Sequence, residues 1–252
     1  HRLFIYTKPE NEALFSGCGF YPIATVPERV VLLENSPVRL KQYQQQLSAL
    51  KKPGKRIGSI VLNANPFTLG HLYLIETALQ QCDWLHVFVV GEERSQCSYA
   101  DRLALVRAGT AHLSRLTIHE GTPYIISRAT FPCYFLKLDD IIFKCHMELD
   151  LTIFRRYIAP PLGITHRFAG SEPYSVITNY YNKQMQVWLD SPEIDAPPIQ
   201  MVEIPRKQFQ GGFISATKVR GFLAEGDFAG IKHYVPECTY RFLINQYEKV
   251  TA

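Results

Sequence analysis

Strand-like and helix-like segments alternate along most of this chain, and no other feature of the sequence restricts its possible folds as much. From residue 57 onward, short runs of branched apolar residues are each followed by a stretch with helical spacing. Strands are expected at 57–62, 84–90, 116–119, 165–169 and 200–204. Helices are expected at 71–79, 100–113, 139–158, 175–189 and from 215 onward. This order predicts an α/β fold with a doubly wound, mainly parallel sheet and helices on both faces.

The first part of the chain follows a different pattern. Residues 3–6 and 29–34 have the composition of buried strands, with a short helix expected at 9–15 between them. A unit of this size is too small to hold a hydrophobic core alone, and the chain opens in a strand without Met, so we expect a fragment of a longer protein. The expected division is a first unit over 1–36, a polar and then basic linker over 37–56, and a main domain over 57–252.

Composition and charge exclude several classes of protein. The 252 residues are 46% hydrophobic and 20% charged, as in ordinary globular proteins, and the net charge of +4 is too small to indicate a nucleic-acid partner. The six cysteines include no C-x-x-C pair, which fits reduced thiols and a cytoplasmic location. Since no apolar run approaches the roughly 20 residues of a membrane helix, we expect no membrane partner either.

The loop after the first strand of the main domain carries the first candidate site. Thr68, Gly70 and His71 stand in the first turn of the helix that follows it. The free amides and partial positive charge of a helix N-terminus favour a phosphate there, and glycine lets a ligand approach the backbone closely. A protonated His71 would add a charged donor, and the Thr68 hydroxyl a neutral one. An N-capping threonine with a structurally bonded histidine is the alternative, and the sequence leaves it open.

A second candidate segment starts another helix much later in the chain. Ser215 and Thr217 place hydroxyl groups at the helix start, after the flexible pair Gly211-Gly212. Lys218 and Arg220 add cations where the helix dipole favours acidic residues, which indicates that an anion binds there. The alternative is a solvated basic helix face.

Together the two segments resemble the HxGH-type nucleotidyltransferase superfamily, whose signatures are T/H-x-G-H and I-S-S-T-x-x-R. Here they read Thr68-Leu69-Gly70-His71 and Ile214-Ser215-Ala216-Thr217-Lys218-Val219-Arg220. The departures are Thr68 for the first His and Ala216 for the second Ser, which removes one hydroxyl contact. The resemblance implies a Rossmann-like sheet of the HUP type.

A narrower resemblance, to the acetate:citrate lyase ligase family (citrate lyase synthetase), covers nearly the whole chain. The segments that carry it come in the family's order: 63–74, 131–137, 170–174, 178–185 and 202–206. Residues 7–11 and 14–20 also resemble the last helix and turn of the GNAT-like acetyltransferase domain of this family. The first unit is therefore expected to be the C-terminal remnant of such a domain, without acetyltransferase activity.

This resemblance implies a reaction and its participants. Enzymes of the family activate acetate with ATP and transfer the acetyl group to the prosthetic-group thiol on the acyl-carrier subunit of citrate lyase, releasing AMP and pyrophosphate. ATP and Mg²⁺ are the implied cofactors, with Mg²⁺ on ATP oxygens and no protein metal ligands. One alternative is another adenylyltransferase of the superfamily that acts on a coenzyme precursor. A non-catalytic nucleotide-binding scaffold is the other, although it would not need two phosphate segments.

The resemblance and the two segments together define a set of candidate site residues. His71, Thr68 and Arg220 are expected to be catalytic. The residues expected to bind the nucleotide are Asn63, Asn65, Phe67, Thr68, Gly70, His71, Gly170, Glu172, Ser215, Thr217, Lys218 and Arg220.

Within this set, Thr68 and His71 are assigned to the reacting phosphates, and Ser215, Thr217 and Arg220 to the leaving pyrophosphate. Gly170 to Glu172 could meet adenine or ribose, or simply form a turn that caps the next helix. Arg94 and Arg102 could reach the same edge of the sheet, with a surface position open for Arg102. His86 is expected to pack within its strand rather than to bind a ligand.

Overall fold

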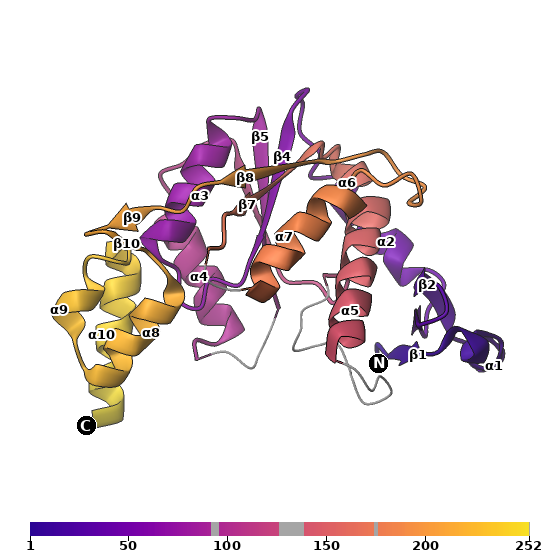
Figure 1. The fold of residues 1–252 in the computed structure, drawn as a ribbon, viewed down its shortest axis with the longest axis horizontal. Helices are drawn as coiled ribbons and strands as arrows, with labels where there is room; N and C mark the ends of the chain where they lie inside the picture. Colours follow the sequence, from indigo (N-terminus) through magenta and orange to yellow (C-terminus); the bar gives the residue numbers. More distant parts are fainter. Residues whose placement is uncertain (92–95, 126–138, 174–175, 252) are drawn as a thin grey trace. The chain divides into compact units, whose positions relative to one another are not determined.

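The computed structural model describes residues 1–91, 96–125, 139–173 and 176–251, and its chain forms two compact units (Figure 1). One unit consists of His1–Pro53, Pro123–Thr165 and Lys183–Met201, and the other of Gly54–Thr122, His166–Asn182 and Val202–Ala252. Both units are therefore discontinuous, whereas the sequence suggested continuous domains. The predicted domain limits at 36 and 57 stay a prediction.

The second unit is built on a five-stranded sheet with the order β6-β5-β4-β7-β8. Its strands are β4 (Ile57–Leu62), β5 (Trp84–Val89), β6 (Leu116–His119), β7 (His166–Gly170) and β8 (Gln200–Ile204). The pairs β4–β5, β5–β6 and β4–β7 are all parallel. Strand order reverses beside β4, so the loop after β4 lies where doubly wound sheets bind their ligands. This arrangement confirms the predicted α/β fold with a mainly parallel sheet.

The predicted strands of this unit agree with the structure because they are buried parallel strands. Almost every residue of β4 and β5 is buried, as expected of strands covered on both faces, and such strands form continuous apolar runs in the sequence. Helices connect and flank the strands: α3 (Leu69–Leu79), α4 (Tyr99–Gly109), α7 (Val176–Trp188), α8 (Ala216–Glu225), α9 (Phe228–Ile231) and α10 (Glu237–Thr251). The predicted helix at 100–113 is thus shorter than expected.

The first unit contains a three-stranded antiparallel sheet with the order β1-β3-β2. Its elements up to residue 53 are β1 (Phe4–Thr7), η1 (Pro9–Asn11), α1 (Glu12–Gly17), β2 (Tyr21–Val26), β3 (Val30–Glu34) and α2 (Arg39–Ser48). The central strand β3 is fully buried, which confirms the strand predicted at 29–34. Strand β2 was not predicted: it carries Pro22, which only an edge strand tolerates, and its pairing is interrupted by an irregularity between Pro22 and Ala24.

Later helices complete the first unit. The helix predicted at 139–158 is divided into α5 (Asp139–Ile153), a π-helix η2 (Phe154–Ile158) and α6 (Ala159–Leu162), and it ends at Gly163 in the left-handed conformation. The Tyr157 hydroxyl donates to the carbonyl of Ile23 in β2 at 2.9 Å. None of the helices in the described ranges combines the length and apolar composition needed to cross a bilayer.

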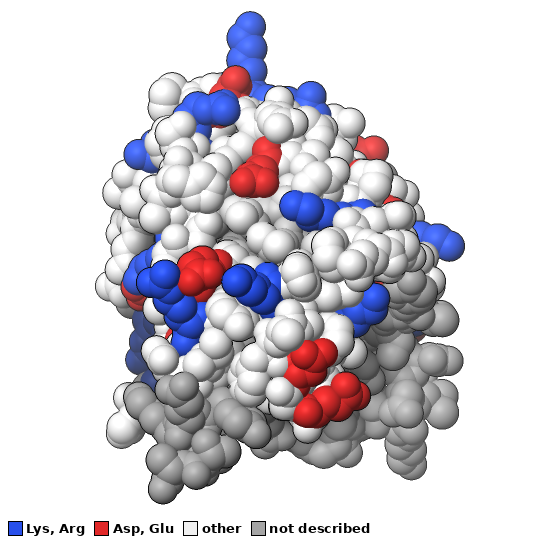
Figure 2. Space-filling model, turned by 90° about the vertical axis from the view of Figure 1, so that its left-hand side faces the viewer, with Lys and Arg blue, Asp and Glu red and all other residues white. Residues whose placement is uncertain are grey.

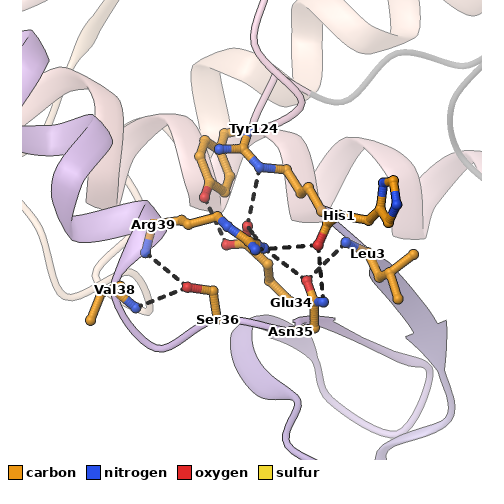
Figure 3. A network of polar contacts seen from close by, with 9 residues as sticks. His1, Leu3, Glu34, Asn35, Ser36, Val38, Arg39 and Tyr124 are labelled. Carbon is orange, nitrogen blue, oxygen red and sulfur yellow. Dashed lines mark hydrogen bonds and ion pairs between the residues drawn. The ribbon is translucent and has the colours of Figure 1, made fainter.

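A buried carboxylate organises one end of the small sheet (Figure 3). Glu34 is 1% exposed and accepts a hydrogen bond from the Tyr124 hydroxyl at 2.7 Å. Its Oε1 lies 3.3 Å from Arg2 Nε and 3.5 Å from Arg39 Nη1, and Arg39 also donates to Asn35 Oδ1 at 2.8 Å. Burial and the neighbouring carboxylate raise the pKa of Tyr124. Because both arginines compensate the buried charge, this network ties the N-terminus, β3 and α2 together.

Candidate active site

The loop between β4 and α3 ends in a reciprocal cap made by Thr68 and His71. Thr68 Oγ1 accepts from the backbone N–H of His71 at 3.4 Å, and His71 Nδ1 accepts from the backbone N–H of Thr68 at 3.0 Å. This is a capping box in which histidine takes the place usually held by Glu or Gln. The geometry thus shows an N-capping threonine and a structurally bonded histidine, which was the alternative interpretation. The cap uses only Nδ1 of the ring, so Nε2 can still contact a ligand.

The same cap fixes the protonation state of His71. Since a backbone N–H can only donate, Nδ1 is an acceptor, and the proton of the neutral ring lies on Nε2. Burial and the charge of Arg206 lower the pKa of His71 to about 4. A charged His71, the condition under which the ring would be a charged donor, does not apply at neutral pH, where His71 is an uncharged donor through Nε2–H.

Phe67 and Thr68 have almost no exposed surface. Phe67 is 0% exposed and its ring stacks on His71, with centroids 5.8 Å apart and planes 14° apart. A Cβ on Gly109 of α4 would lie 2.5 Å from this ring, so glycine is needed for α4 to pack there. Thr68 is 1% exposed. Both side chains contact His71, and their expected contact with the nucleotide stays a prediction.

Arg102 of α4 holds the first half of the loop. It is fully buried, and its Nη1 donates to the carbonyl of Asn63 at 2.6 Å, to Asn63 Oδ1 at 2.7 Å and to the carbonyl of Val90 at 3.0 Å. The guanidinium therefore joins the ends of β4 and β5, and the alternative of a surface position for Arg102 is wrong. Arg94, the other arginine considered for this edge, lies outside the described residues.

Replacing Arg102 by methionine is expected to lower the free energy of unfolding by about 3 kcal/mol, because it removes a charged, buried side chain's hydrogen bonds to three acceptors. Urea unfolding followed by circular dichroism measures the change. Arg107 on the same helix is the control, since it is half-exposed and pairs only with the exposed Glu120. Its replacement by methionine should cost less than about 1 kcal/mol. Equal losses in the two variants would contradict the role of Arg102.

A short hairpin precedes the second candidate segment. Strands β9 (Gln208–Phe209) and β10 (Gly212–Phe213) pair around Gln210 and Gly211, which have φ values of 48° and 74°. Positive φ at both central residues is the mark of a type I′ turn. The glycine pair read as flexible is therefore part of an ordered turn, and strands of two residues are too short for periodicity to reveal. After the hairpin, Ser215 caps α8 by accepting from the backbone N–H of Lys218 at 3.2 Å.

The two candidate segments, far apart in the sequence, lie side by side in this unit. Arg220 Nη1 donates to the carbonyl of Asn65 at 2.6 Å, and its Nη2 donates to Thr217 Oγ1 at 3.0 Å. A Cβ on Gly70 would lie 3.0 Å from the carbonyl oxygen of Ile214. The space left by Gly70 thus admits the backbone of the second segment. The starts of α3 and α8 are brought together as predicted.

The side chains at the start of α8 differ in their surroundings. Ser215 and Arg220 are half-buried, whereas Thr217 and Lys218 are exposed. Lys218 Nζ lies 5.7 Å from the ring centre of Tyr234, whose carbonyl accepts from the backbone N–H of Leu69 at 2.9 Å. Figure 2 views the molecule from the side of α8 to α10, where basic and acidic side chains are interspersed on the described part of the surface.

The loop after β7 is tied to the end of β8. Glu172 is 9% exposed and forms an ion pair with Arg206, whose Nε also donates to the carbonyl of Ser171 at 2.6 Å. Asn182 Nδ2 donates to the carbonyl of Gly170 at 3.0 Å. Glu172, expected to meet adenine or ribose, thus directs its carboxylate to Arg206. A Cβ on Gly170 would have no atom of the described residues within 4 Å.

Arg206 was not among the candidate residues, although it ends the segment 202–206 that carried part of the resemblance. Its position next to Glu172 depends on β7 and β8 being neighbours, which no local pattern reveals. The segment 131–137 and Tyr174, which also carried the resemblance, lie outside the described residues.

Comparison with known proteins decides the family. Residues 57–243 match the model of the citrate lyase ligase C-terminal domain. The chain belongs to the citrate lyase ligase family. The [citrate [pro-3S]-lyase] ligase of Escherichia coli (strain K12) is 54% identical over 246 residues, which cover 98% of this chain and 70% of that relative. The ligase of the same name from Haemophilus influenzae (strain ATCC 51907 / DSM 11121 / KW20 / Rd) is 52% identical over 96% of this chain and 72% of its own.

A solved structure resembles this family member at lower identity. TmcAL from Thermotoga maritima, crystallised with alpha-thio ATP, matches with a TM-score of 0.43 and 18% identity, over 77% of this chain and 56% of that one. Within the described residues of the ligase, no three His, Cys, Asp or Glu side chains gather as a metal site would require.

Two histidines pack inside the ligase sheet, away from the loop. His86 in β5 is fully buried, and its Nδ1 lies 2.8 Å from Nε2 of His119 in β6. The His119 ring stacks on Phe88 with centroids 4.3 Å apart. Burial lowers the pKa of His119 to about 4. The packing interpretation of His86 is confirmed.

The ligase is expected to lose stability as the pH falls from about 6.5 to about 4. In this window the unfolded chain binds protons at His71 and His119 that the folded state excludes, and each histidine contributes up to about 3 kcal/mol that is lost by pH 4. Urea unfolding at several pH values measures the slope. H119Q keeps a hydrogen-bonding partner for His86 and removes one titrating group, so its slope should be shallower. An unchanged slope in H119Q would contradict the shifted pKa of His119.

Proposed function

We propose that this chain catalyses the ATP-dependent acetylation of the thiol form of citrate lyase. Acetate, ATP and the prosthetic-group thiol on the acyl-carrier subunit would give the acetyl thioester, AMP and pyrophosphate, which activates the lyase. Family membership supports the proposal. The observation that carries it is the contact between Arg220 and Asn65, because it joins two helix starts suited to phosphate beside one loop.

The first step forms an acyl phosphate bond. An acetate oxygen attacks the α-phosphorus of ATP, the bond from that phosphorus to the bridging oxygen breaks, and pyrophosphate leaves with the bonding electrons. Acetyl adenylate remains. No protein nucleophile is needed, so positioning of the reactants and stabilisation of charge supply the catalysis. His71 donates from Nε2–H to a phosphate oxygen as charge builds up there, and it neither gains nor loses a proton.

The residues at the start of α8 bind the leaving pyrophosphate. Within the described part of the chain, Arg220 donates to a carbonyl and a hydroxyl oxygen and pairs with no carboxylate, so its charge stays available for a polyanion. Ser215 accepts from a backbone N–H, which leaves its hydroxyl proton to donate. Thr217 holds Arg220 in place, and Lys218 adds positive charge from an exposed position.

The second step transfers the acetyl group. The prosthetic-group thiol, after losing its proton, attacks the carbonyl carbon of acetyl adenylate, the bond to the phosphate oxygen breaks, and AMP leaves. The described residues provide no cluster of acidic side chains for a metal. They therefore fit a Mg²⁺ ion held mainly by phosphate oxygens, which would enter with ATP and offset its negative charge.

We also propose a division into domains and a cellular location for this protein. Residues 1–36 are taken as the end of a GNAT-like domain and 57–252 as the catalytic domain. A cytoplasmic location fits the scattered cysteines.

The test is acetate-dependent formation of AMP. The protein is incubated with ATP, Mg²⁺, acetate and deacetylated citrate lyase, and AMP, pyrophosphate and lyase activity are measured. All three should rise together, and each should require acetate and the free thiol. Accumulation of an adenylylated metabolite instead of AMP would favour the adenylyltransferase alternative. Absence of acetate-dependent exchange between pyrophosphate and ATP would favour the scaffold.

A further inference from the structure

One arginine of this unit has no part in the steps above, although it lies at the same edge of the sheet as His71. Arg206 follows β8, and its side chain is 25% exposed. Its positive charge also lowers the pKa of His71. His71 follows β4 and Arg206 follows β8, which places both at the edge of the sheet where its parallel strands end.

The described residues occupy one edge of the Arg206 guanidinium. Nε donates to the carbonyl of Ser171 at 2.6 Å, and Nη2 donates to the carboxylate of Glu172. Among the described residues, no hydrogen bond of Nη1 is found. A guanidinium has five N–H donors, so the end formed by Nη1 and the second N–H of Nη2 can still hold two oxygen atoms of one ligand.

The loop that holds Arg206 is itself fixed on its other side. Asn182 donates to the carbonyl of Gly170 and Asn179 to that of Glu172, both at 3.0 Å. Arg206 Nε donates to the carbonyl between them, that of Ser171. Three successive carbonyls of the loop are therefore each bound by a side-chain donor. These hydrogen bonds hold the backbone on which Arg206 rests, and no described residue lies within 4 Å of a Cβ placed on Gly170.

The charge around Arg206 favours a small carboxylate over a triphosphate. Glu172 neutralises most of the charge of Arg206, whereas no ion pair of Arg220 is found within the described ranges. A polyanion should therefore bind at Arg220. A paired arginine still offers the planar fork that fits a carboxylate. Its hold on the acyl group weakens once the carboxylate has become an uncharged acyl group in the anhydride bond to phosphorus.

We propose that Arg206 binds the carboxylate of the acid that attacks ATP, and that it presents this acid to the α-phosphorus beside His71. The inference rests on the proposed function, because it assigns the acid within that reaction. Arg206 then contributes mainly to binding of the acid and little to binding of the nucleotide.

The test uses acetate-dependent exchange of pyrophosphate with ATP, which needs no carrier protein. In R206Q the KM for acetate should rise about 10- to 100-fold, as expected for loss of a charged hydrogen-bonding pair, while the KM for ATP stays within about threefold. R206K keeps the charge and loses the fork, so its KM for acetate should be intermediate. R241Q is the matched control, since Arg241 is an exposed arginine paired with Glu237, and it should match the wild type.

E172Q keeps an acceptor for Arg206 and removes the compensating charge, so its KM for acetate should fall by about threefold. This variant keeps the inference testable if R206Q does not fold. A parallel rise in the KM for ATP in R206Q, or a loss of kcat with both KM values unchanged, would overturn the inference, as would an unchanged or higher acetate KM in E172Q. If the wild type itself shows no acetate-dependent exchange, the proposed function fails instead.

Discussion

Replacing His71 by alanine is expected to lower kcat by about 100- to 1000-fold, while the dissociation constant of ATP rises by less than about tenfold. Loss of one donor aimed at a developing oxyanion typically has an effect of this size. The neutral Nε2–H, set by the bond from the Thr68 N–H to Nδ1, is the donor in question. Steady-state AMP formation gives kcat, and equilibrium binding of an ATP analogue gives the dissociation constant.

The alanine variant also removes half of the cap of α3, so a matched variant is needed. H71Q offers a side-chain oxygen to the Thr68 N–H at the position where capping boxes carry Gln. We expect H71Q to unfold near the wild-type temperature and H71A to lose about 1 kcal/mol of stability. Both should lose most of their turnover. Wild-type turnover in H71Q would mean that the ring acts only through the helix.

The second large effect is expected at Arg220. R220A should slow pyrophosphate formation by about 100-fold or more, because it removes the charged donor from the leaving group and the link from α8 to the carbonyl of Asn65. R220K should recover little of the rate, since one ammonium group cannot reproduce the two contacts that the guanidinium makes to Asn65 and Thr217.

Pyrophosphate release, measured with a coupled phosphate assay, checks this prediction. R241Q again serves as the control, because Arg241 is exposed and contacts only Glu237 among the bonds found. Urea unfolding of R220A separates the catalytic effect from the structural one, and loss of the hydrogen bond to Asn65 should cost about 1–3 kcal/mol. Unchanged pyrophosphate release in a folded R220A would remove Arg220 from the site.

Sequence patterns predicted the elements of the sheet well. Residues 57–62 and 116–119 coincide with β4 and β6, since buried parallel strands are continuous apolar runs. The pairing of the α3 and α8 starts was also predictable, because the two segments together resemble the signatures of one superfamily. Strand β2 was missed because proline argues against a strand. The β9–β10 hairpin was missed because strands of two residues are too short to show a pattern.

What the sequence did not reveal was the direction of side chains in the loops. Phe67 and Thr68 stand beside His71 in the motif, yet both turn into the protein, because the cap and the packing against Gly109 decide their orientation. The pairing of Glu172 with Arg206 joins residues from two strands that become neighbours only in the folded sheet. The pKa of His71 is lowered by burial and by the charge of Arg206, which neither residue's local sequence reveals.

The central claim is that the starts of α3 and α8 bind one triphosphate, and a crystal structure with a non-hydrolysable ATP analogue tests it most directly. We expect His71 Nε2 and the Arg220 guanidinium to lie within hydrogen-bonding distance of phosphate oxygens of the same molecule. A triphosphate that touches only one of the two helix starts, or binds at another edge of the sheet, would contradict the account.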